Sequence, residues 1–379
     1  MIKNIVLGMS GGVDSSVCAW VLKQQGYDVT GVFMKNWEDD GEEKHCSWEK
    51  DFADVRSVCD TLDIPYYTVN FEKEYRDYVF DYFLSEYKEG RTPNPDVICN
   101  TEIKFKAFLN YALKIDADAI AMGHYARVEK KDGLYFLKRG ADKSKDQSYF
   151  LSRIGQNALS KVIFPIGDMQ KKQVRQIAHQ LDLTTAEKKD STGICFIGER
   201  NFNNFLSKYL KAENGSIVNI DTLEKIGEHT GLINYTLGQR KGIGIGGVGS
   251  GEPFFVCGKN LGENILYVCQ GADHEALFSK SMIGKDVFWN AKIPSSFPFK
   301  CTAKFRYRQQ DINVSVMQKG NDIIIEYDFP VKAVTPGQIA VLYDGEYCLG
   351  SAVISKICPV NPKYEFLNKN VHYDYVKQL

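Results

Sequence analysis

The stretch Gly8–Ser15, with the sequence Gly-Met-Ser-Gly-Gly-Val-Asp-Ser, constrains the fold of this chain most strongly. It follows the apolar run Ile5–Leu7, which is typical of a buried strand. It precedes residues 16–25, where apolar residues are spaced for one face of a helix. Gly11 and Gly12 allow a tight turn between these elements and a close approach of the backbone to a ligand. The free N–H groups of such a turn favour a bound anion.

This turn differs from two common phosphate-binding loops. It lacks the closing Gly-Lys-Ser/Thr of a Walker loop, and its glycines do not have the Gly-x-Gly-x-x-Gly spacing. Ser10 and Ser15 add hydroxyl donors. Asp14 can cap the helix or hold a metal ion that is bound to the phosphates of a ligand. An ordinary strand-to-helix turn is the alternative. The stretch resembles the pyrophosphate loop of the ATP pyrophosphatases, which implies ATP binding by Gly8, Met9, Ser10, Gly11, Gly12, Val13, Asp14 and Ser15.

Strand and helix patterns alternate after this loop. Expected strands at 29–34 and 66–69 are separated and followed by expected helices at 48–62 and 71–87. This order predicts an α/β fold with a Rossmann-like parallel sheet and right-handed crossovers.

Two positions fall at expected strand ends, on the edge where open α/β sheets bind ligands. Met34 ends the strand 29–34, although strand-end packing explains it equally well. Gly123 follows an expected strand at 119–122, where the lack of a side chain would let a base or ribose lie close. A hairpin is expected over 127–139, around Asp132-Gly133.

The segment 90–100 combines proline with polar residues. Pro93 and Pro95 flank Asn94 and are expected to stiffen an extended loop. With a helix expected over 100–115, Cys99 would sit just before a helix N-terminus, where the pKa of a thiol falls. Cys99, Asn94 and Asp96 together suggest a functional surface. The alternative is a capped loop in which the cysteine has no function.

The chain has ten cysteines and no C-x-x-C pair, so no zinc ribbon is visible. Cys195 stands between Ile194 and Phe196, and a cysteine in such a strand-like run is usually inert. Its residues alone therefore indicate a structural role.

Composition excludes some classes of function. A formal net charge of −1 argues against electrostatic attraction of nucleic acid by the chain as a whole, although the net charge does not exclude a local basic face. No apolar run has the length of a membrane span. Met1 leads almost directly into the first strand, so no signal peptide is expected and we predict a cytoplasmic location without membrane contact.

The second half of the chain is different in character. Helical periodicity fades after residue 202, and short strands with hairpin turns follow residue 280. We expect a small β-rich connecting domain and then a small β-barrel. The predicted division is a loop-bearing ATP-binding catalytic domain, the connecting domain and the barrel, at residues 1–202, 203–280 and 281–379.

Six motifs in order make the chain similar to the tRNA-specific 2-thiouridylase family over nearly its whole length. They are Gly8–Ser15, Thr92–Asn100, Gly123–Ala126, Lys145–Tyr149, Gly193–Gly198 and Leu237–Gly242. The resemblance implies a transferase, a tRNA-uridine 2-sulfurtransferase, that replaces the C2 oxygen of the tRNA wobble uridine with sulfur. ATP with Mg²⁺ would adenylate that oxygen and release pyrophosphate, with no metal site made by protein ligands alone.

The resemblance also implies roles for particular residues. Cys195 would carry a persulfide, and Cys99 would free its sulfur by closing a disulfide or by releasing hydrosulfide. Asn94, Pro95 and Asp96 would receive the flipped base, with Asp96 assisting proton transfer. Met34 and Gly123 would flank the adenosine. The implied tRNA contacts are His124, Lys145, Asp146, Gln147, Arg306, Tyr307 and Gln338. The implied partners are tRNA and a persulfide-carrying sulfur donor, either a cysteine desulfurase or a relay protein.

Three other interpretations remain at this point. A synthetase with the same loop could adenylate a small carbonyl substrate, without needing Cys99 and Cys195 as a pair. A non-catalytic RNA-binding protein could retain the nucleotide fold. A structural disulfide between the two cysteines is disfavoured in a reducing compartment.

Overall fold

A computed structural model describes residues 2–38, 47–190, 193, 197, 202–246 and 251–368. These residues form two compact units, which we describe separately. The first comprises residues up to 81, residues 95–199 and a short piece at 346–349. The second comprises residues 82–94, 200–345 and 350 onward. None of the described helices is long and apolar enough to cross a membrane.

A parallel sheet of five strands is the framework of the first unit. Its strand order is β3-β2-β1-β4-β7, and each neighbouring pair is parallel. The strands are β1 (Asn4–Met9), β2 (Asp28–Lys35), β3 (Tyr66–Asn70), β4 (Ala119–Ala121) and β7 (Val162–Ile163). The predicted Rossmann-like parallel sheet is therefore confirmed. The two-residue strand β7 was not expected from the sequence.

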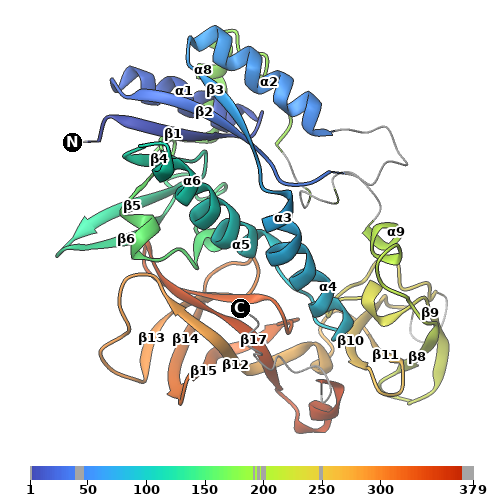
Figure 1. Cartoon of the computed structure of the whole chain (residues 1–379). Helices are drawn as coiled ribbons and strands as arrows, with labels where there is room; N and C mark the ends of the chain where they lie inside the picture. Colours follow the sequence, from blue (N-terminus) through green and yellow to red (C-terminus); the bar gives the residue numbers. More distant parts are fainter. Residues whose placement is uncertain are drawn as a thin grey trace. The chain divides into compact units, whose positions relative to one another are not determined.

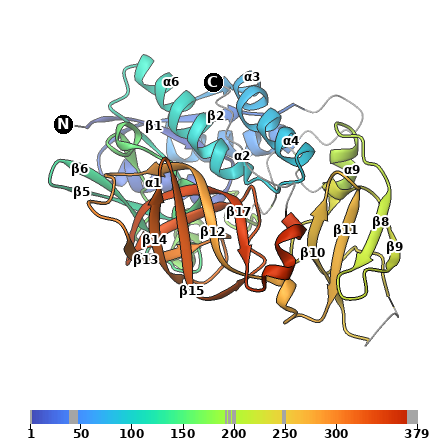
Figure 2. The ribbon, with the colours of Figure 1, turned by 90° about the horizontal axis from the view of Figure 1, so that it is seen from below.

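Helices cover both faces of this sheet, as Figures 1 and 2 show. On one face lie α1 (Val13–Gln24), α2 (Ser47–Leu62) and α8 (Lys171–Gln180). On the other lies α6 (Phe108–Lys114). Side chains of β1, β2, α1, α2 and α8 share one hydrophobic core. Burial of these apolar stripes stabilises the sheet edge from which the glycine turn projects.

Two long helical segments depart from single α-helices. The first is made of α3 (Glu72–Tyr75), a π-helical stretch η1 (Arg76–Phe80) and α4 (Asp81–Lys88). The second is made of α5 (Pro95–Ile98), a π-helical stretch η2 (Cys99–Ala107) and then α6. A π-helix is rare and is often found at functional sites.

The second of these segments corrects the prediction for Cys99. The helix begins at Pro95 rather than at Asn100, because a proline is well tolerated at the first helical position, where no N–H is needed. Cys99 therefore follows the first helical turn instead of preceding it. The field of a helix N-terminus falls off within that turn, so the placement on which the lowered thiol pKa was predicted is not found.

The smaller elements of the first unit are a hairpin and short helices. The hairpin of β5 (Ala126–Lys131) and β6 (Leu134–Arg139) turns at Asp132 and Gly133, which both have positive φ. This confirms the expected hairpin. The short helices are η3 (Ser148–Leu151) and α7 (Gln156–Leu159).

The second unit contains a four-stranded sheet, with the order β10-β11-β8-β9. Its strands are β8 (Gly215–Asn219), β9 (Lys225–His229), β10 (Phe254–Asn260) and β11 (Ile265–Gln270). The short helical elements around it are α9 (Phe202–Ser207), η4 (Leu232–Asn234), η5 (Glu275–Leu277) and η6 (Pro362–Asn368). The sheet agrees with the β-rich segment expected after residue 202.

A closed antiparallel barrel of six strands follows this sheet in the chain, and most of it belongs to the second unit (Figure 2). Its strands are β12 (Phe278–Trp289), β13 (Phe299–Lys304), β14 (Ile312–Lys319), β15 (Asp322–Lys332), β16 (Ile339–Asp344) and β17 (Tyr347–Pro359). Pairing of β12 with β17 closes the ring and confirms the predicted barrel. Strand β13 ends at Lys304, so Arg306 and Tyr307, two of the implied tRNA contacts, lie in the turn that follows it.

One buried lysine links the β10 strand to the end of α4 within the second unit. The Lys259 side chain is buried, with 3% of the residue exposed, and its Nζ donates a hydrogen bond of 3.0 Å to the Gly90 carbonyl oxygen. Burial lowers the pKa of this ammonium group to about 7. A charged lysine in such a place costs free energy of folding.

We predict a pH dependence of stability from this lysine. The pKa of a lysine in an unfolded chain is about 10.4. Between about pH 7 and pH 10.4 the unfolded chain therefore binds more protons than the folded chain does. The free energy of unfolding should therefore rise with pH in this window. Lys259→Met should flatten the rise in urea unfolding curves, whereas the exposed Lys280→Met should leave it unchanged. Equal slopes for the two variants would contradict the prediction.

Candidate active site

The glycine turn between β1 and α1 is held by its own serines. Ser15 Oγ accepts a hydrogen bond of 3.2 Å from the Ser10 amide and donates one of 3.1 Å to the Gly12 carbonyl. Gly11 has a φ of +73°, and a Cβ there would overlap the carbonyl oxygen of Asp51. The turn thus needs glycine for both conformation and space. Gly12 is the N-cap residue of α1 and no side chain caps this helix, so of the two roles that the sequence allowed Asp14, the structure contradicts capping.

Two further predicted residues pack against this turn. A Cβ at Gly123 would come within 3.1 Å of the Ser15 amide nitrogen, so the chain after β4 lies directly on the start of α1. A Cβ at Gly8 would lie 3.2 Å from Met34 Cε and 2.7 Å from Met122 Sδ. The structure therefore brings the loop, Met34 and Gly123 together at the carboxyl edge of the sheet.

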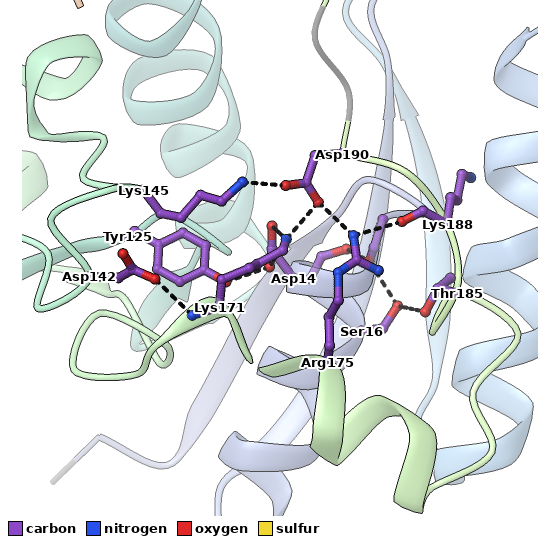
Figure 3. Close-up of polar contacts among 12 residues, drawn as sticks. Asp14, Ser16, Tyr125, Asp142, Lys145, Lys171, Arg175, Thr185, Lys188 and Asp190 are labelled. Carbon is purple, nitrogen blue, oxygen red and sulfur yellow. Dashed lines mark hydrogen bonds and ion pairs between the residues drawn. The ribbon is translucent and has the colours of Figure 1, made fainter. Parts of the chain in front are cut away.

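The Asp14 carboxylate lies at the start of α1 and is bound by two donors (Figure 3). The Tyr125 hydroxyl donates to Asp14 Oδ1 at 2.8 Å, and Lys171 Nζ lies 2.8 Å from both carboxylate oxygens. Burial and the neighbouring Asp14 raise the pKa of Tyr125, so its phenol stays protonated and donates. Lys171 is the first residue of α8, and its side chain is only 12% exposed.

The Asp190 carboxylate contacts three cationic side chains near Asp14. Its oxygens lie 2.7 Å from Lys145 Nζ, 2.7 Å from Lys171 Nζ and 3.1 Å from Arg175 Nη2 (Figure 3). Burial by itself would raise the pKa of Asp190, but the bonds to Lys145 and Lys171 lower it to about 2. The carboxylate is therefore ionised throughout the physiological range.

Sequence analysis missed Lys171, Arg175 and Asp190. Lys171 stands 157 positions from Asp14, and nothing in its local pattern points to the loop. Asp190 does open the segment in which Cys195 was singled out. The absence of a loop lysine was the one available signal, because a pyrophosphate site needs cations from elsewhere in the chain.

The helix that starts at Pro95 carries Asp96 and Cys99 on the same side, three positions apart. Cys99 is buried, with 4% of the residue exposed. Burial raises the pKa of Asp96, although the Lys104 ammonium opposes this shift. Asp96 is thereby a better proton acceptor than an exposed aspartate.

His124 is a buried residue rather than an exposed contact. It is 9% exposed, it packs beside the rings of Phe105 and Phe164, and its Nε2 lies 3.4 Å from Lys104 Nζ. Burial and the Lys104 charge lower the pKa of His124 well below the usual value, so the ring is neutral. Its Nδ1 atom is buried without a hydrogen-bond partner.

Two of the predicted tRNA contacts in the first unit have partners within the protein. Asp146 accepts from the Gly140 amide at 3.0 Å and from the Ser148 amide at 3.1 Å. Gln147 Oε1 accepts from the Tyr125 amide at 3.0 Å. These bonds fix the loop that follows the β5–β6 hairpin.

The same holds for two predicted contacts in the second unit. Arg306 Nη2 donates to the carbonyl oxygens of Leu237 and Ala333, both at 2.9 Å. Gln338 Nε2 donates to the carbonyl oxygens of Thr92 at 2.8 Å and Pro93 at 3.1 Å. Their role toward tRNA stays a prediction.

Two of the predicted site residues are not described within the first unit. Cys195 lies outside the residues that the structure describes. Asn94 ends the piece of chain that belongs to the second unit, whereas Pro95 and Asp96 belong to the first. Among the described residues, no three His, Cys, Asp or Glu side chains come together to hold a metal ion.

A parallel sheet with a serine-closed glycine turn, followed by a closed β-barrel, defines an α/β protein of the pyrophosphate-loop class. Three family models match the chain in order. They are described as a tRNA methyl transferase HUP domain at residues 3–199, a tRNA methyl transferase PRC-barrel domain at 203–270 and an aminomethyltransferase beta-barrel domain at 279–354.

Curated relatives are similar over nearly the full length. The tRNA-specific 2-thiouridylase MnmA of Alkaliphilus oremlandii is 59% identical over 93% of this chain and 97% of its own. The tRNA-specific 2-thiouridylase MnmA 1 of Geobacillus kaustophilus is 57% identical over 94% and 96%. The chain belongs to the tRNA-specific 2-thiouridylase family, whose members are tRNA-uridine 2-sulfurtransferases.

We predict that Gly123→Ala weakens nucleotide binding. The added Cβ would press on the Ser15 amide, whose neighbouring backbone cannot move without opening the turn. We expect about a 10-fold weaker affinity for a non-hydrolysable ATP analogue in calorimetry, equivalent to roughly 1.4 kcal/mol. Gly246→Ala is the control, because a Cβ there would meet no atom within 4 Å. Unchanged affinity for Gly123→Ala would contradict this prediction.

Proposed function

We propose that this chain catalyses ATP-dependent 2-thiolation of the wobble uridine of tRNA. The C2 carbonyl oxygen of uridine is a poor leaving group, so the reaction needs activation. The uridine oxygen attacks the α-phosphorus of ATP, the bond to pyrophosphate breaks, and an O-adenylated uridine forms. Sulfur then replaces the oxygen at C2, and AMP departs.

The first unit would supply the nucleotide site. The amides of Ser10–Ser15 would hold the pyrophosphate part of ATP, and Met34 and Gly123 would flank the adenosine. Both carboxylate oxygens of Asp14 are bound by Lys171 Nζ at 2.8 Å, so Asp14 does not fit Mg²⁺ in this arrangement, and the ion would be held mainly by the phosphates. The magnesium ion would neutralise charge on the phosphates. Asp14 and Lys171 orient the phosphate end from the protein side.

The two cysteines would carry the sulfur. The terminal sulfur of a Cys195 persulfide attacks C2, and the C2–O bond to AMP breaks. The Cys99 thiolate then attacks the Cys195 sulfur, which breaks the persulfide bond and leaves a Cys99–Cys195 disulfide that must be reduced before the next turnover. In the other order, Cys99 first releases hydrosulfide, which attacks C2 itself.

The remaining roles follow from the same proposal. Asp96 would take the proton lost from the uridine ring, and its raised pKa supports this role. Asn94, Pro95 and Asp96 would receive the flipped base. The tRNA contacts proposed are Gln147, Arg306, Tyr307 and Gln338. His124 and Asp146 are buried and Lys145 pairs with Asp190, so these three would support the site from within the protein. The division into domains at 1–202, 203–280 and 281–379, the persulfide-carrying donor protein and the cytoplasmic location are proposed with it.

A single observation carries the proposal. The serine-closed turn, with Gly123 packed on the helix start, occurs in a chain that is 59% identical to a tRNA-specific 2-thiouridylase over 97% of that relative. The descriptions of two of the matching family models name a tRNA methyl transferase. A pyrophosphate loop supports thiolation over methyl transfer, because thiolation needs an adenylated oxygen and methyl transfer does not.

We predict that both proposed sulfur-carrying cysteines are required. Cys99→Ser and Cys195→Ser should each lower labelled-sulfur transfer into tRNA by at least about 100-fold, a loss of roughly 2.7 kcal/mol of transition-state stabilisation. Cys301→Ser is the matched control, because burial raises the pKa of that thiol to about 12 and keeps it protonated. Unchanged transfer by either of the first two variants would remove the two-cysteine scheme.

The activation step predicts pyrophosphate release that depends on tRNA. Incubation with ATP and a tRNA bearing an unmodified wobble uridine should release pyrophosphate, whereas the same tRNA with cytidine at that position should not. Release that needs a small carboxylic acid but no tRNA would favour the small-substrate synthetase instead. Mass analysis of the recovered tRNA should show the gain expected for exchange of oxygen by sulfur.

A further inference from the structure

Five charged side chains form a compact cluster at the start of α1, entirely within the first unit. The cluster has two carboxylates, Asp14 and Asp190, and Lys171 contacts both of them. The other two members, Lys145 and Arg175, contact Asp190 (Figure 3). We call this set the cation cluster. Three positive charges against two negative ones leave a surplus of one positive charge beside the N–H groups of the turn.

Two of the three cations, Arg175 and Lys171, are also held by groups other than Asp190. Arg175 Nη1 donates to the Ala186 carbonyl at 2.7 Å, and Nη2 donates to the Lys188 carbonyl at 3.1 Å. Lys171 is held by Asp14 and by the bond of 2.9 Å from its own amide to Asp142. Removing Asp190 would therefore leave the Lys171 and Arg175 donors preformed around the vacated position, with the more exposed Lys145 beside them.

A phosphate group satisfies such donors better than a carboxylate does. It has three terminal oxygens and up to two negative charges, whereas Asp190 offers two oxygens and one charge. Ammonium and guanidinium groups are the side chains that recognise phosphate. The cluster also adjoins a helix N-terminus, where the backbone adds to the attraction for an anion.

The loop sequence explains why donors from elsewhere are needed. It has no lysine of the Walker type to reach the outer phosphates. Lys171, the first residue of α8, places its ammonium group 2.8 Å from the loop residue Asp14. The tertiary structure thus supplies from another helix the kind of charge that the loop itself lacks.

We propose that Lys145, Lys171 and Arg175 form the subsite for the pyrophosphate end of the nucleotide, and that Asp190 occupies it until the nucleotide binds. This inference rests on the proposed function and deepens it. Asp190 acts as a built-in competitor, so the phosphates must displace its carboxylate from the three cations. The competition lowers the affinity for pyrophosphate and ATP, but not for a ligand that ends at the α-phosphate.

The test is calorimetric titration of the full chain with inorganic pyrophosphate, a non-hydrolysable ATP analogue and AMP, all with Mg²⁺. Asp190→Asn removes the competing charge and should bind pyrophosphate and the analogue about 10-fold more tightly than the native chain. Lys145→Gln should bind both about 10-fold more weakly. Neither variant should change the affinity for AMP by more than about 2-fold.

A matched variant separates the subsite from general electrostatics. Asp54→Asn removes one negative charge from the neighbouring pair with Lys188, which is not part of the cation cluster, and should leave all three affinities unchanged. Circular dichroism of each variant checks the fold. Lys145 is 39% exposed, so its variant keeps the test valid if Asp190→Asn fails to fold.

The outcomes distinguish this inference from the proposed function. Native binding of the ATP analogue, with no gain in Asp190→Asn and no loss in Lys145→Gln, would overturn the subsite and leave the proposed function standing. Equal gains for Asp190→Asn and Asp54→Asn would also overturn it, since charge alone would explain both. Absence of any nucleotide binding by the native chain and by Asp190→Asn would overturn both proposals.

Discussion

The ammonium group of Lys171, held between Asp14 and Asp190, is the contact on which the site of the first unit depends. It joins the start of α8 to Asp14 of α1, 157 positions earlier, and to Asp190 in the chain that follows α8. Because the side chain is almost buried, its charge is poorly solvated and needs both carboxylates. The turn, the cations and the edge of the sheet are thereby fixed to one another before any ligand arrives.

In the second unit, the segment that leads to Asn94 is held through its backbone. The Gly90 carbonyl accepts from Lys259, and the carbonyl oxygens of Thr92 and Pro93 accept from Gln338. A short piece of chain without its own ladder of hydrogen bonds needs such partners, because an unpaired buried carbonyl is costly. Gln338 thus positions this segment through its backbone.

The helix that starts at Pro95 changes how the proposed chemistry is supported. Cys99 does not stand before a helix N-terminus, and Asp96 lies three positions earlier on the same side of the helix. The helix continues as a π-helical stretch that carries Lys104, whose charge acts on both Asp96 and His124. The pKa shifts of Asp96 and His124 therefore come from burial and from this lysine.

The sequence by itself determined the parallel sheet, the glycine turn, the hairpin at Asp132-Gly133 and the barrel, because strand and helix periodicity and turn chemistry are local. It also pointed to the family through its six ordered motifs. Only the tertiary structure decided that Lys171 and Asp190 meet Asp14, that His124 is buried and that the helix begins at Pro95. These features depend on contacts between residues far apart in the chain, or on which of two permitted roles a proline takes, and no local pattern of residues specifies either.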